Sequence, residues 1–228
     1  LAAFFGGMLV SLFTKHGGVG VSPDSIYYLS AADSLKAGHG YYQFDDTPFI
    51  MFPLFFPTSI ALIETIFQQA YFQLAPYVNA ILFGCTIFLS GCMLEQTNHT
   101  KWLKWVVLLM IALSPSLLEV YSMLWSETWY VLEVILFIWF IKKYFEIPTL
   151  QNVCYVAMVA AIAAETRLIG VSVIATGGLL LILNHELELR KKIGHFLLFG
   201  FIACIPFILN LTRNYYLTQT LTGIRQKG

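Results

Sequence analysis

Long apolar stretches, joined by short connectors that carry lysine and arginine, make up most of this 228-residue sequence. Hydrophobic residues account for 58% of the chain and charged residues for only 11%, whereas an average soluble domain contains roughly 45–50% and 25%. Helices satisfy their own backbone hydrogen bonds and can expose apolar side chains to lipid. We therefore expect an all-α, multi-pass membrane protein.

The charge balance and the cysteines exclude several other classes. There are 13 basic and 13 acidic residues, so the chain has no net field that would attract nucleic acid. The four cysteines lie in apolar stretches without a CxxC spacing or a histidine partner, which favours neither a zinc site nor a disulfide framework. They are Cys85, Cys92, Cys154 and Cys204.

The basic connectors predict the topology. Residues 95–104, 142–152 and 184–193 carry clustered Lys and Arg and should face the cytoplasm by the positive-inside rule. The chain must then cross the membrane an even number of times between them. One helix over residues 105–141 would be about 55 Å long, nearly twice the hydrocarbon thickness. We expect two crossings there, with a turn at residues 118–127.

The same parity argument divides the rest of the chain. Residues 153–183 become two short helices with Arg167 at an outer turn, and residues 194–212 form the last crossing. Residues 75–94 read as a span with Pro76 near its first helical position. With the apolar residues 1–14, which are too few for a complete span, this gives about seven crossings. We expect residues 1–228 to be a single transmembrane domain and a fragment of a longer protein.

This topology leaves residues 15–73 as a long first extracytoplasmic loop. Residues 23–38 predict an amphipathic helix with Ser22 as its cap and Gly38 as its stop. Residues 53–67 predict a helix in the outer membrane interface. Placing a polar or charged side chain in the membrane costs free energy, so such residues tend to be functional. Most of them fall on this outer side, and we therefore expect an outward-facing polar site.

Asp24 is the first candidate for that site. It lies in the first turn of the loop helix, where a carboxylate is favoured by the helix dipole without any further role. The alternative is a general base held at the membrane face. Tyr27 and Tyr28 share its helical face and are candidate pocket residues. Asp33 is nine residues further on, which is half a turn out of phase.

Cationic and polar residues further along the chain complete the candidate set. Arg167 needs a partner near the membrane, and a lipid phosphate, Glu127 or Asp24 would suit it. Glu127 follows Ser126 at an expected helix start, which is also an ordinary helix-start pattern. Arg213 has the default role of an interfacial anchor. His39 lies in a glycine turn and has no second histidine at metal-ligand spacing.

The order of these motifs resembles the GT-C class of polytopic glycosyltransferases, which contains protein O-mannosyltransferases and aminoarabinose transferases. The resemblance covers nearly the whole chain. It rests on Asp24-Ser25-Ile26-Tyr27-Tyr28, Ser34-Leu35-Lys36-Ala37-Gly38-His39-Gly40, Phe52-Pro53-Leu54-Phe55-Phe56-Pro57, Ser126-Glu127, Arg167-Leu168-Ile169-Gly170, Arg213-Asn214-Tyr215 and Thr222-Gly223-Ile224-Arg225.

The resemblance implies a plasma (inner) membrane enzyme that transfers a sugar from a polyprenyl phosphate to a lipid, glycan or protein acceptor on the extracytoplasmic side. Asp24 matches the class's base or metal-linked acid. Many members have an Asp-Glu pair there, whereas this chain has Asp24-Ser25, so a divalent metal is left open. Arg167, or Arg213 as the second choice, would neutralise the charge of the carrier phosphate. Further substrate contacts would come from Glu127, Tyr27, Tyr28 and His39. Residues 49–67 would guide the polyprenyl tail.

A transporter or lipid flippase is the main alternative from another class. A polytopic chain with charges at the membrane edge suits it equally well. It would, however, place ionisable residues in the middle of the spans. Only Glu133 lies well inside an expected crossing.

Overall fold

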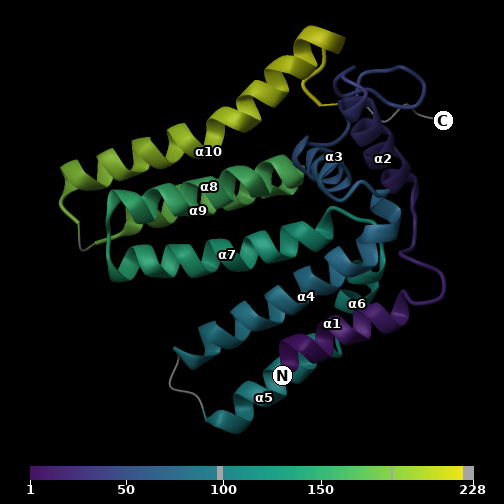
Figure 1. Cartoon of the computed structure of the whole chain (residues 1–228). Coiled ribbons are helices and arrows are strands. Elements are labelled where there is room, and N and C mark those ends of the chain that lie inside the picture. The colour runs from purple at the N-terminus through teal and green to yellow at the C-terminus, as the bar shows by residue number, and fades with distance from the viewer. Residues whose placement is uncertain (97–99, 186, 223–228) are drawn as a thin grey trace. The chain divides into compact units, whose positions relative to one another are not determined.

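The computed structural model describes residues 1–96, 100–185 and 187–222 (Figure 1). These residues form ten α-helices and one short 3-10 helix, and no strand is found among them, which confirms the expected all-α class. The helices are α1 (Ala2–Phe13), α2 (Pro23–Lys36), α3 (Phe55–Phe67), α4 (Tyr71–Glu95), α5 (Lys101–Ala112), α6 (Pro115–Ser122), α7 (Glu127–Glu146), α8 (Leu150–Thr166), η1 (Leu168–Gly170), α9 (Val171–Leu183) and α10 (Leu189–Thr218).

Two of the described helices are long and apolar enough to cross a membrane. They are α4, with 25 residues, and α10, with 30 residues. The pair α5 and α6 passes the same test together but bends by 47° at its break. Helices α1, α3, α8 and the η1–α9 segment are apolar but shorter. Helix α7 has 20 residues, but charged side chains, including Glu133 near its middle, lower its hydropathy.

The chain forms two compact units. Unit 1 consists of Leu1–Asp45 and Pro57–Ile135, and unit 2 consists of Asp46–Phe56 and Leu136–Gly228. The division falls within α3 and within α7. Each unit has its own packed helices, which are described separately below.

In unit 1, helices α1, α4, α5 and α6 pack on one another (Figure 1). Their buried cluster includes Val10, Phe83 and Tyr121, and the rings of the last two lie 4.7 Å apart. Glycine allows α1 and α4 to approach closely, because a Cβ on Gly7 would lie 3.0 Å from the Ala80 carbonyl oxygen. Small residues serve the same purpose where helices pack in membranes.

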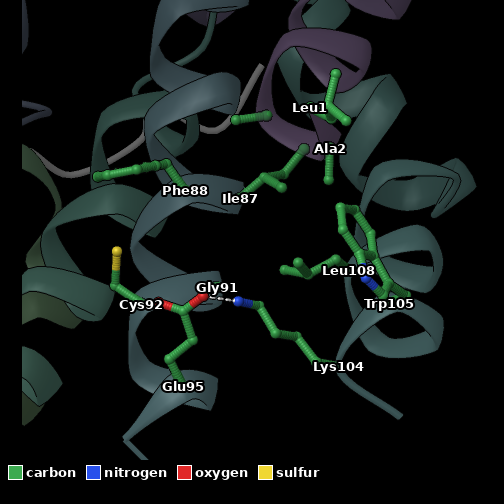
Figure 2. A pocket seen from close by; sticks show the side chains of 11 residues that line it. Leu1, Ala2, Ile87, Phe88, Gly91, Cys92, Glu95, Lys104, Trp105 and Leu108 are labelled. Atoms are coloured by element: carbon green, nitrogen blue, oxygen red, sulfur yellow. Dashed lines mark hydrogen bonds and ion pairs between the residues drawn. The ribbon is translucent and has the colours of Figure 1, made fainter. Parts of the chain in front are cut away.

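A small cavity of about 160 Å³ lies between α1, α4 and α5 of unit 1 (Figure 2). Its walls are mostly apolar, with Ile87 and Leu108 facing each other across it. At one end Lys104 forms an ion pair with Glu95. This contact joins the ends of α4 and α5 on either side of the first basic connector.

In unit 2, α8, α9 and α10 run side by side (Figure 1). Helix α8 contributes a nearly continuous buried face of small residues, among them Ala157, Ala160 and Ala164. A Cβ on Gly177 of α9 would lie 2.5 Å from the Phe199 ring of α10. Here too, small side chains allow close helix packing.

Three expected element boundaries are wrong. The span predicted for residues 75–94 begins at Tyr71, so Pro76 lies inside α4. The Glu64 carboxylate stabilises this early start, because it accepts a 2.6 Å hydrogen bond from the Tyr71 backbone N–H and so satisfies a donor at the helix start. The last span, predicted for residues 194–212, extends over Leu189–Thr218. The turn predicted for residues 118–127 is shorter, because α6 continues to Ser122.

Three other sequence expectations match the described helices. Ser22 caps α2, with its side chain accepting from the Ser25 N–H while the Ser25 side chain accepts from the Ser22 N–H. Gly38, just after the helix, has a φ of +80°, a backbone conformation that glycine adopts without a Cβ penalty. The break between α8 and η1 falls at Arg167.

Candidate active site

The start of α2 is held against residues 122–126 of unit 1 by backbone hydrogen bonds. The Gly20 N–H donates to the Ser122 carbonyl oxygen at 2.8 Å, and the Leu124 N–H donates to the Gly20 carbonyl oxygen at 2.8 Å. The Met123 side chain packs closely on Gly20, since a Cβ at this position would lie 2.2 Å from its sulfur. The two segments are about 100 residues apart in sequence, so this pairing is a tertiary feature.

Side chains strengthen the same junction, which we call the α2 anchor. The Trp125 indole N–H donates to Ser22 Oγ at 2.9 Å. Ser25 Oγ donates to the Leu124 carbonyl oxygen at 2.8 Å. The Tyr28 and Ser126 hydroxyls lie 3.3 Å apart. Ser25, Tyr28 and Ser126 are all buried, so the first turns of α2 are rigidly positioned.

Asp24 lies in the first turn of α2, between the anchored residues Ser22 and Ser25. Its side chain is half-buried. Within the described part of the chain it has neither a hydrogen bond nor an ion pair. A carboxylate at a helix N-terminus is favoured by about 0.3–1 kcal/mol, and here it remains available to an external group.

The neighbouring tyrosines have different surroundings. Tyr28 is only 3% exposed and serves the anchor through its hydroxyl. Tyr27 is half-buried, and its ring stacks on Phe44 with centroids 5.9 Å apart. Of the two, Tyr27 retains more accessible surface beside Asp24. The role of either ring in substrate binding stays a prediction.

Glu127 and His39 are the other candidates in unit 1. Glu127 is the first residue of α7 and directly follows the anchor residue Ser126. His39 is exposed beyond the end of α2 and is flanked by Gly38 and Gly40, both with positive φ. The α2 anchor therefore brings the Asp24 and Glu127 segments together, whereas His39 lies outside it.

Arg167 belongs to unit 2 and ends α8 in an extended conformation, with φ −146° and ψ 142°. Its backbone N–H donates to the Ala163 carbonyl oxygen, and its carbonyl oxygen accepts from the Gly170 N–H at 2.8 Å. A Cβ on Gly170 would lie 2.0 Å from the Ala163 carbonyl oxygen. Gly170 thus permits the tight turn that positions Arg167.

Arg213, also in unit 2, is held by α10 and by the 46–56 segment. Its Nη1 donates to the Phe49 carbonyl oxygen and to Asn214 Oδ1, each at 3.0 Å. One turn earlier, Asn210 Nδ2 donates to Glu165 Oε2 at 3.3 Å. Residues 49–67 are the stretch expected to guide the polyprenyl tail. Phe49 is fully buried there, whereas Leu62, Ile66 and Phe67 are exposed.

Sequence reasoning missed several residues of these arrangements. Asn210 and Asn214 are four residues apart and therefore share a helical face, and both are buried. That spacing of two amides in an apolar helix is a usable signal. The roles of Gly20 and Trp125 in the anchor have no local signal, because their partners lie far away in sequence.

The candidates are divided between the two units. Asp24, Tyr27, Tyr28, Glu127 and His39 lie in unit 1, and Arg167 and Arg213 lie in unit 2. The pairing of Arg167 with a lipid phosphate, Glu127 or Asp24 stays a prediction. Gly223, Ile224 and Arg225 of the last resemblance motif lie outside the described residues.

A metal requirement receives no support from the donor set. The described residues contain no group of three or more His, Cys, Asp or Glu side chains that could hold a metal ion. Ser25, which stands where many members of the resembled class have Glu, uses its hydroxyl to donate to the Leu124 carbonyl oxygen. The divalent metal that the resemblance leaves open therefore stays without a candidate set of ligands among the described residues.

Comparisons with protein-family models, with curated proteins and with solved structures find no match for this chain.

Proposed function

We propose that this chain is a membrane glycosyltransferase that moves a sugar from a polyprenyl phosphate to a hydroxyl of a lipid, glycan or protein acceptor. The proposal rests on the motif resemblance to the GT-C class. The structural observation that supports it is Asp24, a half-buried carboxylate without a partner in the described chain, on a helix start that is fixed by the α2 anchor. Catalysis needs a base that is held in place but not already paired.

In the proposed reaction, Asp24 accepts the proton of the acceptor hydroxyl. The hydroxyl oxygen forms a bond to the anomeric carbon while the bond from that carbon to the phosphate oxygen breaks, which inverts the configuration. The lipid phosphate leaves with the bonding electrons. An arginine at the membrane boundary, Arg167 or Arg213, stabilises the charge that develops there.

The proposed membrane arrangement completes this function. Helices α4 and α10 are full spans, and α1, α5–α6, α7, α8 and α9 supply the others, for about seven crossings of the plasma membrane. The loop of residues 15–73 lies on the extracytoplasmic side, with α2 and α3 at the interface. Asp24 would then face acceptors outside the cell.

The transfer assay tests the proposal directly. The protein, reconstituted in lipid vesicles, is given polyprenyl-phosphate donors with radiolabelled sugars and a mixed acceptor extract. We expect label to appear in an acceptor and free polyprenyl phosphate to accumulate in equal amount. If the donors remain intact and no acceptor becomes labelled, the proposal is overturned.

A transporter or flippase is the second candidate, and Glu133 favours it. This carboxylate is 5% exposed within α7, and ionisable groups buried in a span often mark a transport path. The same vesicles separate the two functions. A flippase would move intact donor across the bilayer without breaking the bond between the sugar and the phosphate.

The orientation can be tested by thiol labelling of intact cells. In a variant whose four native cysteines are replaced by serine, His39→Cys should react with a membrane-impermeant maleimide and Lys191→Cys should not. The reason is that residue 39 belongs to the proposed outer loop and residue 191 to a basic inner connector. Labelling at position 191 but not at position 39 would reverse the orientation and with it the site.

A further inference from the structure

A polar pocket of about 540 Å³ lies between α2 and the end of α3 in unit 1. This volume falls in the range of small-molecule sites, about 300–1,000 Å³. Asp33 and Lys36 line it from α2, and Asp33 is half a helical turn out of phase with Asp24. The facing wall is formed by Glu64, Gln68, Gln69 and Phe72. The pocket is therefore separate from the proposed base.

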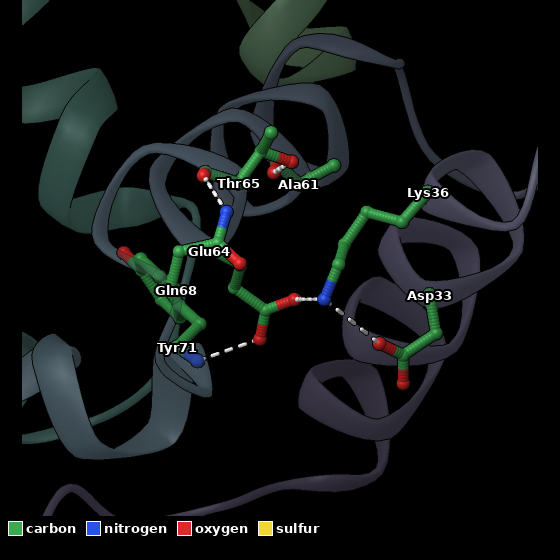
Figure 3. A network of polar contacts seen from close by, with 7 residues as sticks. All are labelled: Asp33, Lys36, Ala61, Glu64, Thr65, Gln68 and Tyr71. Carbon is green, nitrogen blue, oxygen red and sulfur yellow. Dashed lines mark hydrogen bonds and ion pairs between the residues drawn. The ribbon is translucent and has the colours of Figure 1, made fainter.

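An ion pair that joins α2 to α3 fixes one side of this pocket (Figure 3). The Lys36 ammonium lies 2.7 Å from Glu64 Oε2, and Glu64 Oε1 accepts from the Tyr71 backbone N–H at 2.6 Å. Glu64 is only 7% exposed. The hydrogen bond to Glu64 raises the pKa of Lys36 above its usual value, so this lysine holds its proton more firmly than an isolated one. Both oxygens of Glu64 are already used within the protein.

Asp33, unlike Glu64, has carboxylate oxygens that a ligand can reach. Its Oδ1 is 4.0 Å from the Lys36 nitrogen, and its side chain is 73% exposed. Burial of the carboxyl, together with the charge of Glu64, raises the pKa of Asp33, and Lys36 opposes that shift. Because most of its side chain is exposed and its contact with Lys36 is long, Asp33 keeps acceptor oxygens for a ligand. The side-chain amide of Gln69 supplies donors and an acceptor. The Gln68 amide nitrogen already donates to the Thr65 carbonyl oxygen, which leaves its second N–H and its oxygen for a ligand.

The lining selects a class of ligand by its charge. Asp33, Glu64 and Lys36 together carry a net charge of about −1, which disfavours phosphates and other anions. A divalent cation is disfavoured as well, because the Lys36 ammonium already occupies the space between the two carboxylates. A neutral molecule rich in hydroxyl groups fits, since its hydroxyls can donate to a carboxylate in charge-assisted hydrogen bonds.

Phe72 adds an apolar wall to this polar set. It lines the pocket and remains 40% exposed. A sugar ring presents hydroxyls at its edge and C–H groups on its faces, so it can use the polar and the aromatic walls at once. Other hydroxylated molecules without a ring face would use only the polar wall.

From this juxtaposition of Asp33, Gln68, Gln69 and Phe72 we infer that the pocket binds a neutral saccharide unit. Its assignment to the acceptor side of the reaction rests on the proposed function. The sugar binding itself does not, since it follows from the lining alone. The pocket would hold part of a glycan acceptor while another hydroxyl is presented for transfer.

Saturation-transfer NMR of the solubilised full chain, without any donor, tests this inference. The probes are maltotriose, mannotriose and chitotriose, with inorganic phosphate and Mg²⁺ as competitors. We expect at least one trisaccharide to bind, and neither competitor to displace it. Asp33→Ala should weaken that binding about tenfold, as expected for the loss of a hydrogen bond to a charged group. Gln69→Ala should weaken it less, because Gln69 is neutral and exposed.

Glu119→Ala is the matched control, because Glu119 is an exposed carboxylate on another helix of unit 1 and should leave the affinity unchanged. Asp33 is mostly exposed, so Asp33→Ala should keep the wild-type melting temperature. The inference is overturned if no trisaccharide binds the wild-type chain, or if Asp33→Ala binds as tightly as wild type. If the chain binds a trisaccharide but transfers no sugar, the saccharide pocket stands and only its role as an acceptor site is overturned.

Discussion

Asp24→Asn should lower the rate of sugar transfer by about 10²–10⁴-fold, the usual contribution of a general base. Asparagine has nearly the same shape as aspartate but cannot take a proton from the acceptor hydroxyl. Initial rates of label transfer from the polyprenyl-phosphate donor, at saturating donor and acceptor, measure this effect. Because the base acts in the chemical step, kcat should fall much more than the apparent affinity for either substrate.

The variant should fold normally. The α2 anchor depends on Ser22, Ser25 and Tyr28, and the Asp24 side chain takes part in none of its contacts. Loss of a favourable carboxylate at the helix start costs about 0.3–1 kcal/mol. The melting temperature and the retention of carrier lipid should therefore stay close to those of the wild-type chain.

Glu119→Gln is the matched control for charge. Glu119 is an exposed carboxylate of α6 in the same unit, and its neutralisation should leave transfer unchanged. Wild-type turnover in Asp24→Asn would remove the named base and would move the transporter or flippase proposal to first place. A low rate accompanied by a large loss of thermal stability would contradict the catalytic role and make Asp24 a structural residue.

Much of the local structure could be predicted from the sequence where the signal lies within a few residues. Ser22-Pro23 at the start of α2 and Gly38 beyond its end are such signals, and the helix lies where they place it. The break at Arg167 is instead predicted from the even number of crossings required between two basic connectors. Class prediction also succeeds, because composition alone favours a helical chain.

The predicted helix boundaries were wrong where a residue on another helix stabilises the helix end. Helix α4 begins at Tyr71, whose N–H donates to Glu64, seven residues earlier and on another helix. The sequence of α4 alone pointed to Pro76 as the start, since proline favours the first turn. Likewise, Asn79 donates to the carbonyl oxygens of Tyr121 and Met123, a contact that no local pattern predicts.

The candidate site divides in the same way. Asp24 could be singled out only through the motif resemblance, because a carboxylate in the first turn after a capping serine is an ordinary helix-start pattern. The anchor that fixes it depends on Gly20, Leu124 and Trp125, whose pairing is a consequence of folding. The polar pocket beside Lys36 was missed for the same reason, since Glu64 read only as an interruption of an apolar helix.

Gly170→Ala should destabilise the chain strongly, because the added methyl group has no room. A Cβ at this position would lie 2.0 Å from the Ala163 carbonyl oxygen, 2.3 Å from the Ala163 carbonyl carbon and 2.5 Å from the Ala164 nitrogen. All three are backbone atoms of α8 and cannot rotate away. Forcing extra atoms into a packed site costs about 1–3 kcal/mol and sometimes more.

The strain should fall on the turn that positions Arg167, since the Gly170 N–H donates to the Arg167 carbonyl oxygen. A cost of 1–3 kcal/mol corresponds to a fall in the melting temperature of roughly 2–12 °C for a chain of this size. Thermal unfolding in detergent, followed by circular dichroism, measures it. Gly200→Ala is the matched control, because Gly200 lies inside α10 with no atom within 4 Å of a new Cβ. Alanine there should raise helix stability by up to about 1 kcal/mol. If both variants melt at the wild-type temperature, the close approach of η1 to α8 is wrong, and so is the tight turn proposed to hold Arg167.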